Sequence, residues 1–104
     1  MRKLVYLADA RRDIDAAFDF QLEMTGDPDQ AEKLVVSLDA QCRKIASTSI
    51  MLGRPRDSLR KGLRSMPFGN YMIFLKYGVD VLEIVNILHG RSDIEAMFQD
   101  KGED

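Results

Sequence analysis

The sequence has no tryptophan, one cysteine and one histidine among its 104 residues. A single cysteine excludes an internal disulfide, which suits a reducing compartment. One cysteine and one histidine also exclude a metal site built from several ligands of these two types. We therefore expect neither a metal nor a cofactor.

The chain also lacks long apolar runs and a strong excess of one charge. No run approaches the ~20 apolar residues required to cross a bilayer. The N-terminal stretch MRKLVYLADARRD has too few apolar residues before charge returns to be a secretory signal. Fifteen Lys and Arg against seventeen Asp and Glu give a net charge of −2, so the chain as a whole is not a basic nucleic-acid binder. These absences predict a cytoplasmic protein without membrane contact.

The composition is that of an ordinary globular protein, with 45% hydrophobic and 31% charged residues. A length of 104 residues fits one domain over 1–104 and leaves no room for two. A domain of this size buries a modest core, roughly 65% of the surface of its unfolded chain. An exposed groove on it is therefore expected to need a partner.

The first third of the chain predicts a short strand and a helix. Residues 3–8 (KLVYLA) form a short β-prone run, and Asp9 is a candidate N-cap for a helix over 11–24. Apolar residues in that helix recur every four positions, so one side is expected to face the core. They are Ile14, Phe18 and Leu22.

A second helix follows a strong break in the chain. Gly26 is expected to end the first helix in a left-handed conformation, with Asp27 as the cap of the second and Pro28 at its first position. The second helix is predicted to run to about Leu52 and to pack against the first as an antiparallel hairpin. Its apolar seam contains Cys42, which we interpret as a small buried hydrophobe rather than a nucleophile or redox thiol.

The second half predicts three strands joined by tight turns. Pro67 limits the first strand because proline donates no hydrogen bond to a ladder. Gly69-Asn70 is a pair typical of a two-residue hairpin turn, and residues 78–80 make the next turn. The predicted strands cover residues 62–66, 71–77 and 81–88.

The predicted fold class is α+β with the order β-α-α-β-β-β, a helical hairpin packed on a small, mostly antiparallel sheet. Ser92 or Asp93 can cap a final helical turn that includes Met97 and Phe98.

Positive charge is concentrated between residues 54 and 64. Five basic residues face only Asp57 there, which gives a local charge of +4 (5 − 1). Such a patch can bind a phosphate backbone, receive an acidic partner segment, or simply be a solvated linker. The basic residues are Arg54, Arg56, Arg60, Lys61 and Arg64.

The lone histidine closes the last predicted strand. His89 can act as a general acid or base, with Arg64 and Arg91 as candidate phosphate-binding cations. The plainer interpretation is that His89 fixes the turn after the strand by hydrogen bonding. We favour the second, because the sequence places no nucleophile or base beside it and contains no P-loop, Rossmann glycine run, zinc-ligand spacing or nucleophile elbow. No catalytic residue is predicted.

Nearly the whole chain resembles the ParE branch of the ParE/RelE toxins of bacterial type II toxin–antitoxin modules. The runs GRPRDSLRKGLRSMPFGNYMIFLKY and VLEIVNILHGRSDIEAMF carry the resemblance, with TGDPDQAEKL and CRKIA upstream. The specific feature is the combination of Gly53-Arg54-Pro55, Gly62-Leu63-Arg64 and His89-Gly90-Arg91 at these separations.

The resemblance implies a RelE-like fold, a ParD-like antitoxin that wraps the toxin, and DNA gyrase as a target poisoned by protein contact. On this basis the chain is expected not to be an enzyme and to meet DNA only through its antitoxin. The expected antitoxin-binding residues are Arg54, Arg56, Arg60 and Arg64. The expected target-facing residues are His89, Arg91 and Phe98.

Two other functions stay open. RelE-like members are ribosome-dependent mRNA endoribonucleases that use clustered Lys and Arg, often with a Tyr or a His-Tyr pair near the C-terminus. Here Gly90 follows His89 and no tyrosine follows Tyr77, which counts against that activity. A degenerate toxin that only assembles with its antitoxin is the remaining alternative.

Overall fold

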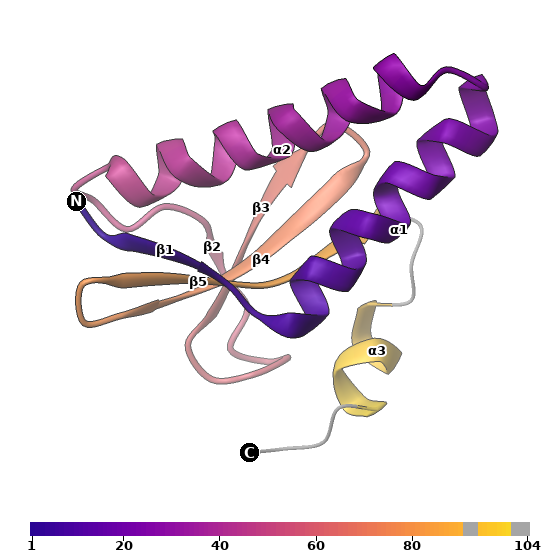
Figure 1. Cartoon of the computed structure of the whole chain (residues 1–104). Coiled ribbons are helices and arrows are strands. Elements are labelled where there is room, and N and C mark those ends of the chain that lie inside the picture. The colour runs from indigo at the N-terminus through magenta and orange to yellow at the C-terminus, as the bar shows by residue number, and fades with distance from the viewer. Residues whose placement is uncertain (91–93, 101–104) are drawn as a thin grey trace.

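The chain forms a five-stranded sheet with a helical hairpin across one face (Figure 1). The computed structural model describes residues 1–90 and 94–100. Its elements, in chain order, are β1 (Lys3–Tyr6), α1 (Ala8–Thr25), α2 (Pro28–Ser47), β2 (Arg54–Pro55), β3 (Leu63–Phe68), β4 (Tyr71–Gly78), β5 (Val81–His89) and α3 (Ile94–Asp100). The predicted α+β order is confirmed, and α3 corresponds to the predicted final helical turn around Met97 and Phe98; only the two-residue β2 is added.

The strand order in the sheet is β1-β5-β4-β3-β2. β1 pairs in parallel with β5, while the other neighbours pair antiparallel, so the sheet is mixed and mostly antiparallel. The parallel pair arises because the helical hairpin carries the chain from β1 across the sheet before the antiparallel meander begins. Neither α1 nor α2, nor any other helix in the described ranges, qualifies as a membrane span.

The break between the helices has the predicted chemistry. Gly26 adopts φ 68° and its N–H donates to the Leu22 carbonyl at 2.7 Å, a left-handed end for α1. An Asp27 carboxylate oxygen accepts from the Asp29 N–H at 2.9 Å, and Pro28 opens α2. Backbone groups at the end of α1 and at the start of α2 thus find hydrogen-bond partners within four residues, which fixes the turn of the hairpin.

Both outer helix ends differ from the prediction. α1 begins at Ala8, so Asp9 lies in its first turn beside Arg12 and does not cap it. α2 ends at Ser47, well before the expected Leu52, because the Thr48 hydroxyl donates to the Lys44 carbonyl at 2.8 Å and its N–H turns back to Ile45. The helix ends there because side-chain hydroxyls compete with backbone N–H groups for its last carbonyls.

β3 extends through Pro67 to Phe68, beyond the limit set in the prediction. β2 pairs only with Arg64 and Ser65, so the later part of β3 has one strand neighbour. The Leu63 carbonyl accepts from Arg56, which shows that odd-numbered residues of β3 direct their backbone groups to the β2 side. The nitrogen of Pro67 therefore lies on an edge, where no ladder hydrogen bond is lost.

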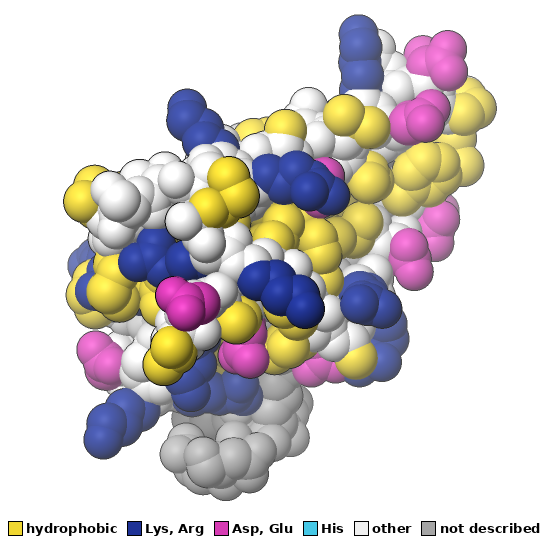
Figure 2. Space-filling view, turned by 60° about the vertical axis from the view of Figure 1, so that its left-hand side comes forward, with side chains coloured by type: hydrophobic (Ala, Val, Ile, Leu, Met, Phe, Trp, Pro, Cys, Tyr) yellow, Lys and Arg dark blue, Asp and Glu magenta, His cyan; other side chains and the backbone are white. Residues whose placement is uncertain are grey.

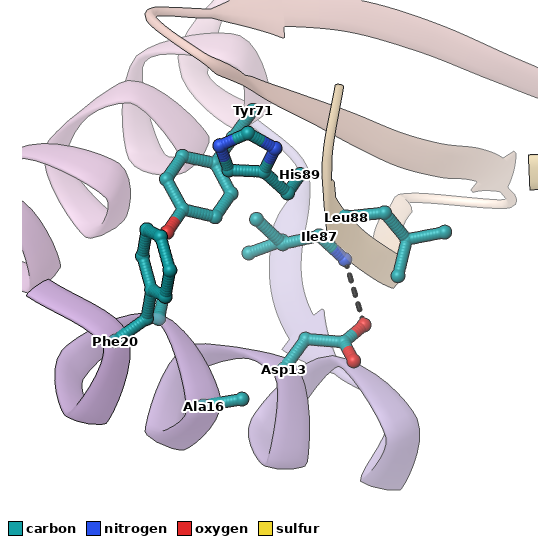
Figure 3. Close-up of a pocket in the computed structure, with 8 residues that line it drawn as sticks. Asp13, Ala16, Phe20, Tyr71, Ile87, Leu88 and His89 are labelled. Carbon is teal, nitrogen blue, oxygen red and sulfur yellow. Dashed lines mark hydrogen bonds between the residues drawn. The ribbon is translucent and has the colours of Figure 1, made fainter. Parts of the chain in front are cut away.

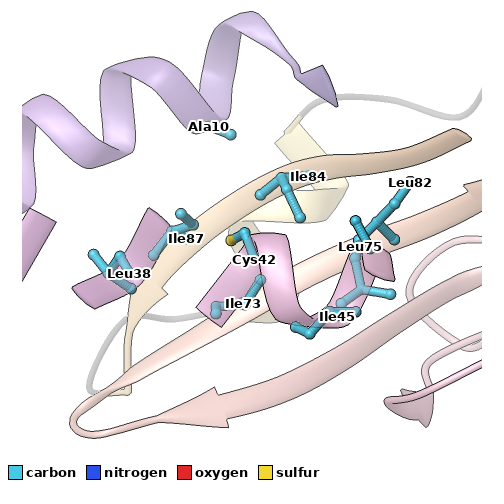
Figure 4. Packing of buried hydrophobic residues seen from close by; sticks show 10 residues of the cluster. Ala10, Leu38, Cys42, Ile45, Ile73, Leu75, Leu82, Ile84 and Ile87 are labelled. Atoms are coloured by element: carbon cyan, nitrogen blue, oxygen red, sulfur yellow. The ribbon is translucent and has the colours of Figure 1, made fainter. Parts of the chain in front are cut away.

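The middle of the sheet is buried on both faces. Figure 4 shows the larger cluster, where Leu38, Cys42 and Ile45 of α2 lie over inward-facing residues of β4 and β5. A second cluster lies beneath the sheet and joins Phe74 and Leu88 to residues of β3 and α3. Burial on both faces explains why the sequences of β4 and β5 are nearly continuous apolar runs. It also confirms Cys42 as a buried core residue.

Candidate functional site

A pocket lies where α1 crosses the end of β5 (Figure 3). Its volume is about 270 Å³, and Phe20, Tyr71 and His89 form one side of it. The His89 ring centroid lies 5.3 Å from that of Tyr71 and 5.8 Å from that of Phe20, both in edge-on arrangements. The imidazole is thus part of an aromatic cluster.

A β-bulge brings Tyr71 and His89 together. β4 and β5 pair Leu75 with Ile84 but Phe74 with Asn86, so one extra residue, Val85, enters β5. The shift places Tyr71 opposite His89 rather than opposite Leu88. The sequence-based interpretation missed this pair because it looked for a tyrosine after the histidine. The turn at residues 78–80 gives the approximate register of β4 and β5, but not the bulge.

Asp13 at the base of the pocket has a structural role. One oxygen of its carboxylate accepts from the Asn86 side-chain amide at 2.7 Å and from the Ile87 N–H at 2.9 Å. β1 accompanies β5 only as far as Ile84, so Asp13 caps the part of that strand edge that β1 leaves open. This carboxylate joins α1 to β5 and is occupied by two donors.

The phenol of Tyr71 is poorly suited to act as a base. Burial raises the pKa of Tyr71 above its ordinary value of 10.0, so the hydroxyl stays protonated at neutral pH. The site therefore offers an imidazole and a neutral phenol beside an occupied carboxylate.

A wider hollow of about 530 Å³ continues from this pocket along α1 toward the β3–β4 turn. Phe20 and Met24 line it from the helix while exposing 46% and 67% of their surfaces, and Pro67 and Met72 line it from the strands. We call the pocket and this hollow together the α1 groove. Exposed apolar grooves are common sites of protein–protein contact.

The arginines of residues 54–64 do not converge on His89. Arg56 donates to the Ser65 hydroxyl at 2.7 Å, Arg64 donates to the Gly53 carbonyl at 2.7 Å, and Arg60 lies 5.3 Å from the Phe98 ring centroid. These guanidinium groups stabilise the β2–β3 segment and its contact with α3. Arg54 is exposed. Arg64 pairs with Leu75, whereas His89 pairs with Tyr71 at the other end of β4.

Phe98 is buried, with 4% of its surface exposed, and its ring lies edge-on to Phe74 at 5.0 Å between centroids. This differs from the surface position that we expected for it, because α3 turns its apolar side to the underside of the sheet. Arg91, Ser92 and Asp93 lie outside the described residues, so the expected helix cap and the contribution of Arg91 stay predictions.

The Cys42 thiol does not have the environment of a nucleophile. Burial raises its pKa to about 11, so it is a thiol at neutral pH. Within residues 1–90 and 94–100, no group of three His, Cys, Asp or Glu side chains is placed to hold a metal ion.

Comparison with solved structures identifies the fold. The chain matches a structure described as "Chromosomal ParDE TA system from P. aeruginosa" with a TM-score of 0.75 and 22% identity, over 86% of this chain and 96% of that chain. At this identity the likeness shows the fold alone. A comparison with curated proteins gives no match.

The class that this architecture defines is a small α+β fold with a helical hairpin across one face of a mixed sheet. A family model described as the ParE toxin of the type II toxin–antitoxin system parDE matches residues 4–94. The chain therefore belongs to the ParE toxin family, which confirms the resemblance seen in its sequence.

Proposed function

We propose that this ParE toxin inhibits DNA gyrase by protein–protein contact, without breaking a bond itself, and that a ParD-like antitoxin neutralises it. Membership of the ParE family supports the proposal. The observation that carries it is the contrast between the open α1 groove and the guanidinium groups of Arg56 and Arg64, which donate hydrogen bonds away from His89. A binding surface needs exposed apolar area, whereas phosphodiester cleavage needs cations and an acid–base pair aimed at one point.

The antitoxin would cover the exposed faces of the helical hairpin and the arginines of residues 54–64. Phe20 and Met24 are apolar anchors that a partner helix or strand can bury. Arg54 is the most available arginine of its group for a partner carboxylate, since Arg56 and Arg64 already donate within the toxin. The segment from His89 to Phe98 remains our proposed target-facing region, with His89 and Arg91 as its polar contacts.

The remaining parts of the proposal follow from this function. A gyrase inhibitor acts in the cytoplasm, and the chain would work as one domain over residues 1–104, without a cofactor. Its contact with operator DNA would run through the antitoxin.

A RelE-like nuclease is the second candidate because Tyr71 and His89 lie side by side. This pair is the one geometric feature that favours cleavage over contact. Against it, Arg56 and Arg64 make hydrogen bonds near the opposite end of β3 and β4.

Two assays on the purified toxin separate the candidates: supercoiling by DNA gyrase and cleavage of mRNA on translating ribosomes. We expect gyrase inhibition that added antitoxin relieves, and no cleavage. Cleavage without gyrase inhibition would overturn the proposal, and no effect on growth after overexpression would indicate a degenerate toxin.

Two matched variants sharpen the test. Tyr71→Phe keeps the ring contact with His89 and removes only the hydroxyl, while His89→Ala removes the imidazole. A contact inhibitor should retain its activity in Tyr71→Phe within about twofold, whereas a nuclease that uses these groups should lose on the order of 100-fold in both. Loss of all toxicity in His89→Ala, with folding and antitoxin binding intact and Tyr71→Phe still active, would contradict a purely structural role for this histidine and support its proposed contact with the target.

A further inference from the structure

The outer edge of β1 has the geometry of a site for an added strand. The N–H groups of Lys3 and Leu7 donate to Asp80 and Ile84 at 2.8 and 3.0 Å, so these residues point toward β5. Backbone groups alternate along a strand, which directs those of Leu4 and Tyr6 to the other side. In the described part of the chain the sheet ends at β1, so no strand of the toxin pairs with that side.

A hollow of about 610 Å³ lies along this edge, between β1 and the C-terminal half of α2. Its apolar floor includes Leu4, Ala40 and Ala46. On the face turned forward in Figure 2, dark blue Lys and Arg side chains surround a yellow apolar area. The basic residues that line the hollow are Arg2, Lys3, Arg43 and Lys44.

Two of these cations are available to a partner. Arg2 donates to the Thr48 carbonyl at 2.8 Å, and Arg43 is paired with Asp39 at 2.7 Å. Lys3 and Lys44 are exposed and form no ion pair among the described residues. They border the edge from opposite faces, because the neighbouring Leu4 packs toward the helices and Lys3 must point the other way.

The C-terminal end of α2 does not cancel this positive charge. Free carbonyls at a helix end carry partial negative charge and would repel an acidic ligand. Here the Ala46 carbonyl accepts from the Arg2 N–H at 3.0 Å, and the Lys44 carbonyl accepts from the Ser47 and Thr48 hydroxyls at 3.0 and 2.8 Å. The hollow is thus positive, with an open ladder of backbone groups at one wall.

We propose that this edge binds an extended acidic peptide segment, which adds to β1 as a sixth strand and directs carboxylates to Lys3 and Lys44. Backbone hydrogen bonds would supply affinity, and alternate side chains would fill the apolar floor on one face and meet Lys3 on the other. The inference rests on the proposed function in one respect, since the antitoxin would supply the segment.

Hydrogen exchange on ¹⁵N-labelled toxin tests the strand addition, with the antitoxin encoded in the same operon as the probe. On binding, the amides of Leu4 and Tyr6 should exchange at least ~10-fold more slowly, whereas those of Lys3 and Val5, which already face β5, should change little. Unchanged exchange at Leu4 and Tyr6 in a formed complex would overturn the inference and leave the proposed function standing. Protection of these amides in the free toxin that rises with its concentration would assign the edge to a second copy of the chain, and would also overturn it.

Charge reversal tests the electrostatic part. Lys3→Glu/Lys44→Glu should weaken antitoxin binding at least ~10-fold at low ionic strength, with the loss shrinking as salt is added. Lys76→Glu is the control for the single replacements Lys3→Glu and Lys44→Glu, because it has the same charge change at an exposed position on β4, away from the hollow and from the helical hairpin, and it should stay within about twofold of the parent. An effect of Lys76→Glu equal to that of Lys3→Glu or Lys44→Glu would refute the acidic character of the segment. Failure of the parent toxin to bind the antitoxin at all would overturn both the inference and the antitoxin part of the proposed function.

Discussion

Replacing Asp13 with alanine should destabilise the protein far more than its position on a helix surface suggests. The carboxylate accepts from the buried Asn86 side chain at 2.7 Å and from the Ile87 N–H at 2.9 Å. Asp13→Ala removes the acceptor of both donors. A buried donor that loses its acceptor costs about 1–3 kcal/mol. Water can reach the half-exposed site in part, so we expect a loss of about 2–4 kcal/mol of unfolding free energy.

That loss is large for a domain of this size, whose total stability is expected to be about 5–15 kcal/mol. Urea unfolding followed by circular dichroism measures it, and the melting temperature should fall by roughly 10–25 °C. Asp15→Ala is the matched control, because Asp15 lies on the exposed face of the same helix. Its cost should stay within about 0.5 kcal/mol.

A double-mutant cycle with Asn86→Ala isolates the pair. Once Asp13 is gone, the second replacement should cost about 1 kcal/mol less than it does alone, because the shared hydrogen bond has already been lost. A loss in Asp13→Ala no greater than that in Asp15→Ala would refute the idea that this carboxylate caps the edge of β5. Additive effects in the cycle would contradict the role of Asn86.

Three further predictions concern the core and the turns. The Cys42 thiol, with a pKa raised by burial to about 11, should react on the order of 100-fold more slowly with a disulfide reagent at pH 8 in the folded protein than in urea, and equal rates would contradict its burial. Burial, and then the hydrogen bond to Asp39 at 2.6 Å, raise the pKa of Tyr6 above its ordinary value of 10.0. The stability that Tyr6 contributes is therefore complete below pH 10 and lost as the pH rises further, so stability should fall less steeply above pH 10 in Tyr6→Phe than in the parent, and identical slopes in alkaline urea titrations would refute this. Gly26→Ala, at φ 68° with no other atoms within 4 Å of the added Cβ, should cost about 1 kcal/mol from backbone strain alone, and no change in urea midpoint would show that the turn relaxes.

Much of the fold could be predicted from local chemistry. The sequence Gly26-Asp27-Pro28 specifies a left-handed helix end, a cap and a first helical residue, and all three are present. The Gly69-Asn70 pair specifies a two-residue turn, and β3 and β4 meet there with Phe68 opposite Tyr71. In each case the residues that determine the structure are adjacent in the chain.

The features that could not be predicted depend on distant contacts. The sequence does not indicate that β1 lies beside β5, because this parallel pairing depends on how the helical hairpin packs on the sheet. The sequence predicts one patch of arginines, but Arg56 and Arg64 turn inward to Ser65 and Gly53. Charge counting along the chain cannot distinguish a guanidinium that is bonded internally from one that is exposed.

The candidate site shows the same division. The sequence indicates His89 as a candidate because it is the only histidine, yet its neighbours Phe20 and Tyr71 come from elements that the sequence does not place beside it. The register of a hairpin can be counted from its turn only while each strand contributes one residue per pair. β5 breaks that condition at Val85.

The extra residue in β5 makes the two sides of the sheet depend on chain length. Before Val85, even-numbered side chains such as Leu82 and Ile84 lie under the helices, and beyond it odd-numbered ones such as Ile87 do. If β5 kept its length but paired without the bulge, the imidazole of His89 would face the apolar cluster around Phe98, and Leu88 would face the helices in its place. Deleting Val85 would remove the bulge and leave both directions unchanged, so homologous toxins should lose this residue and the bulge together.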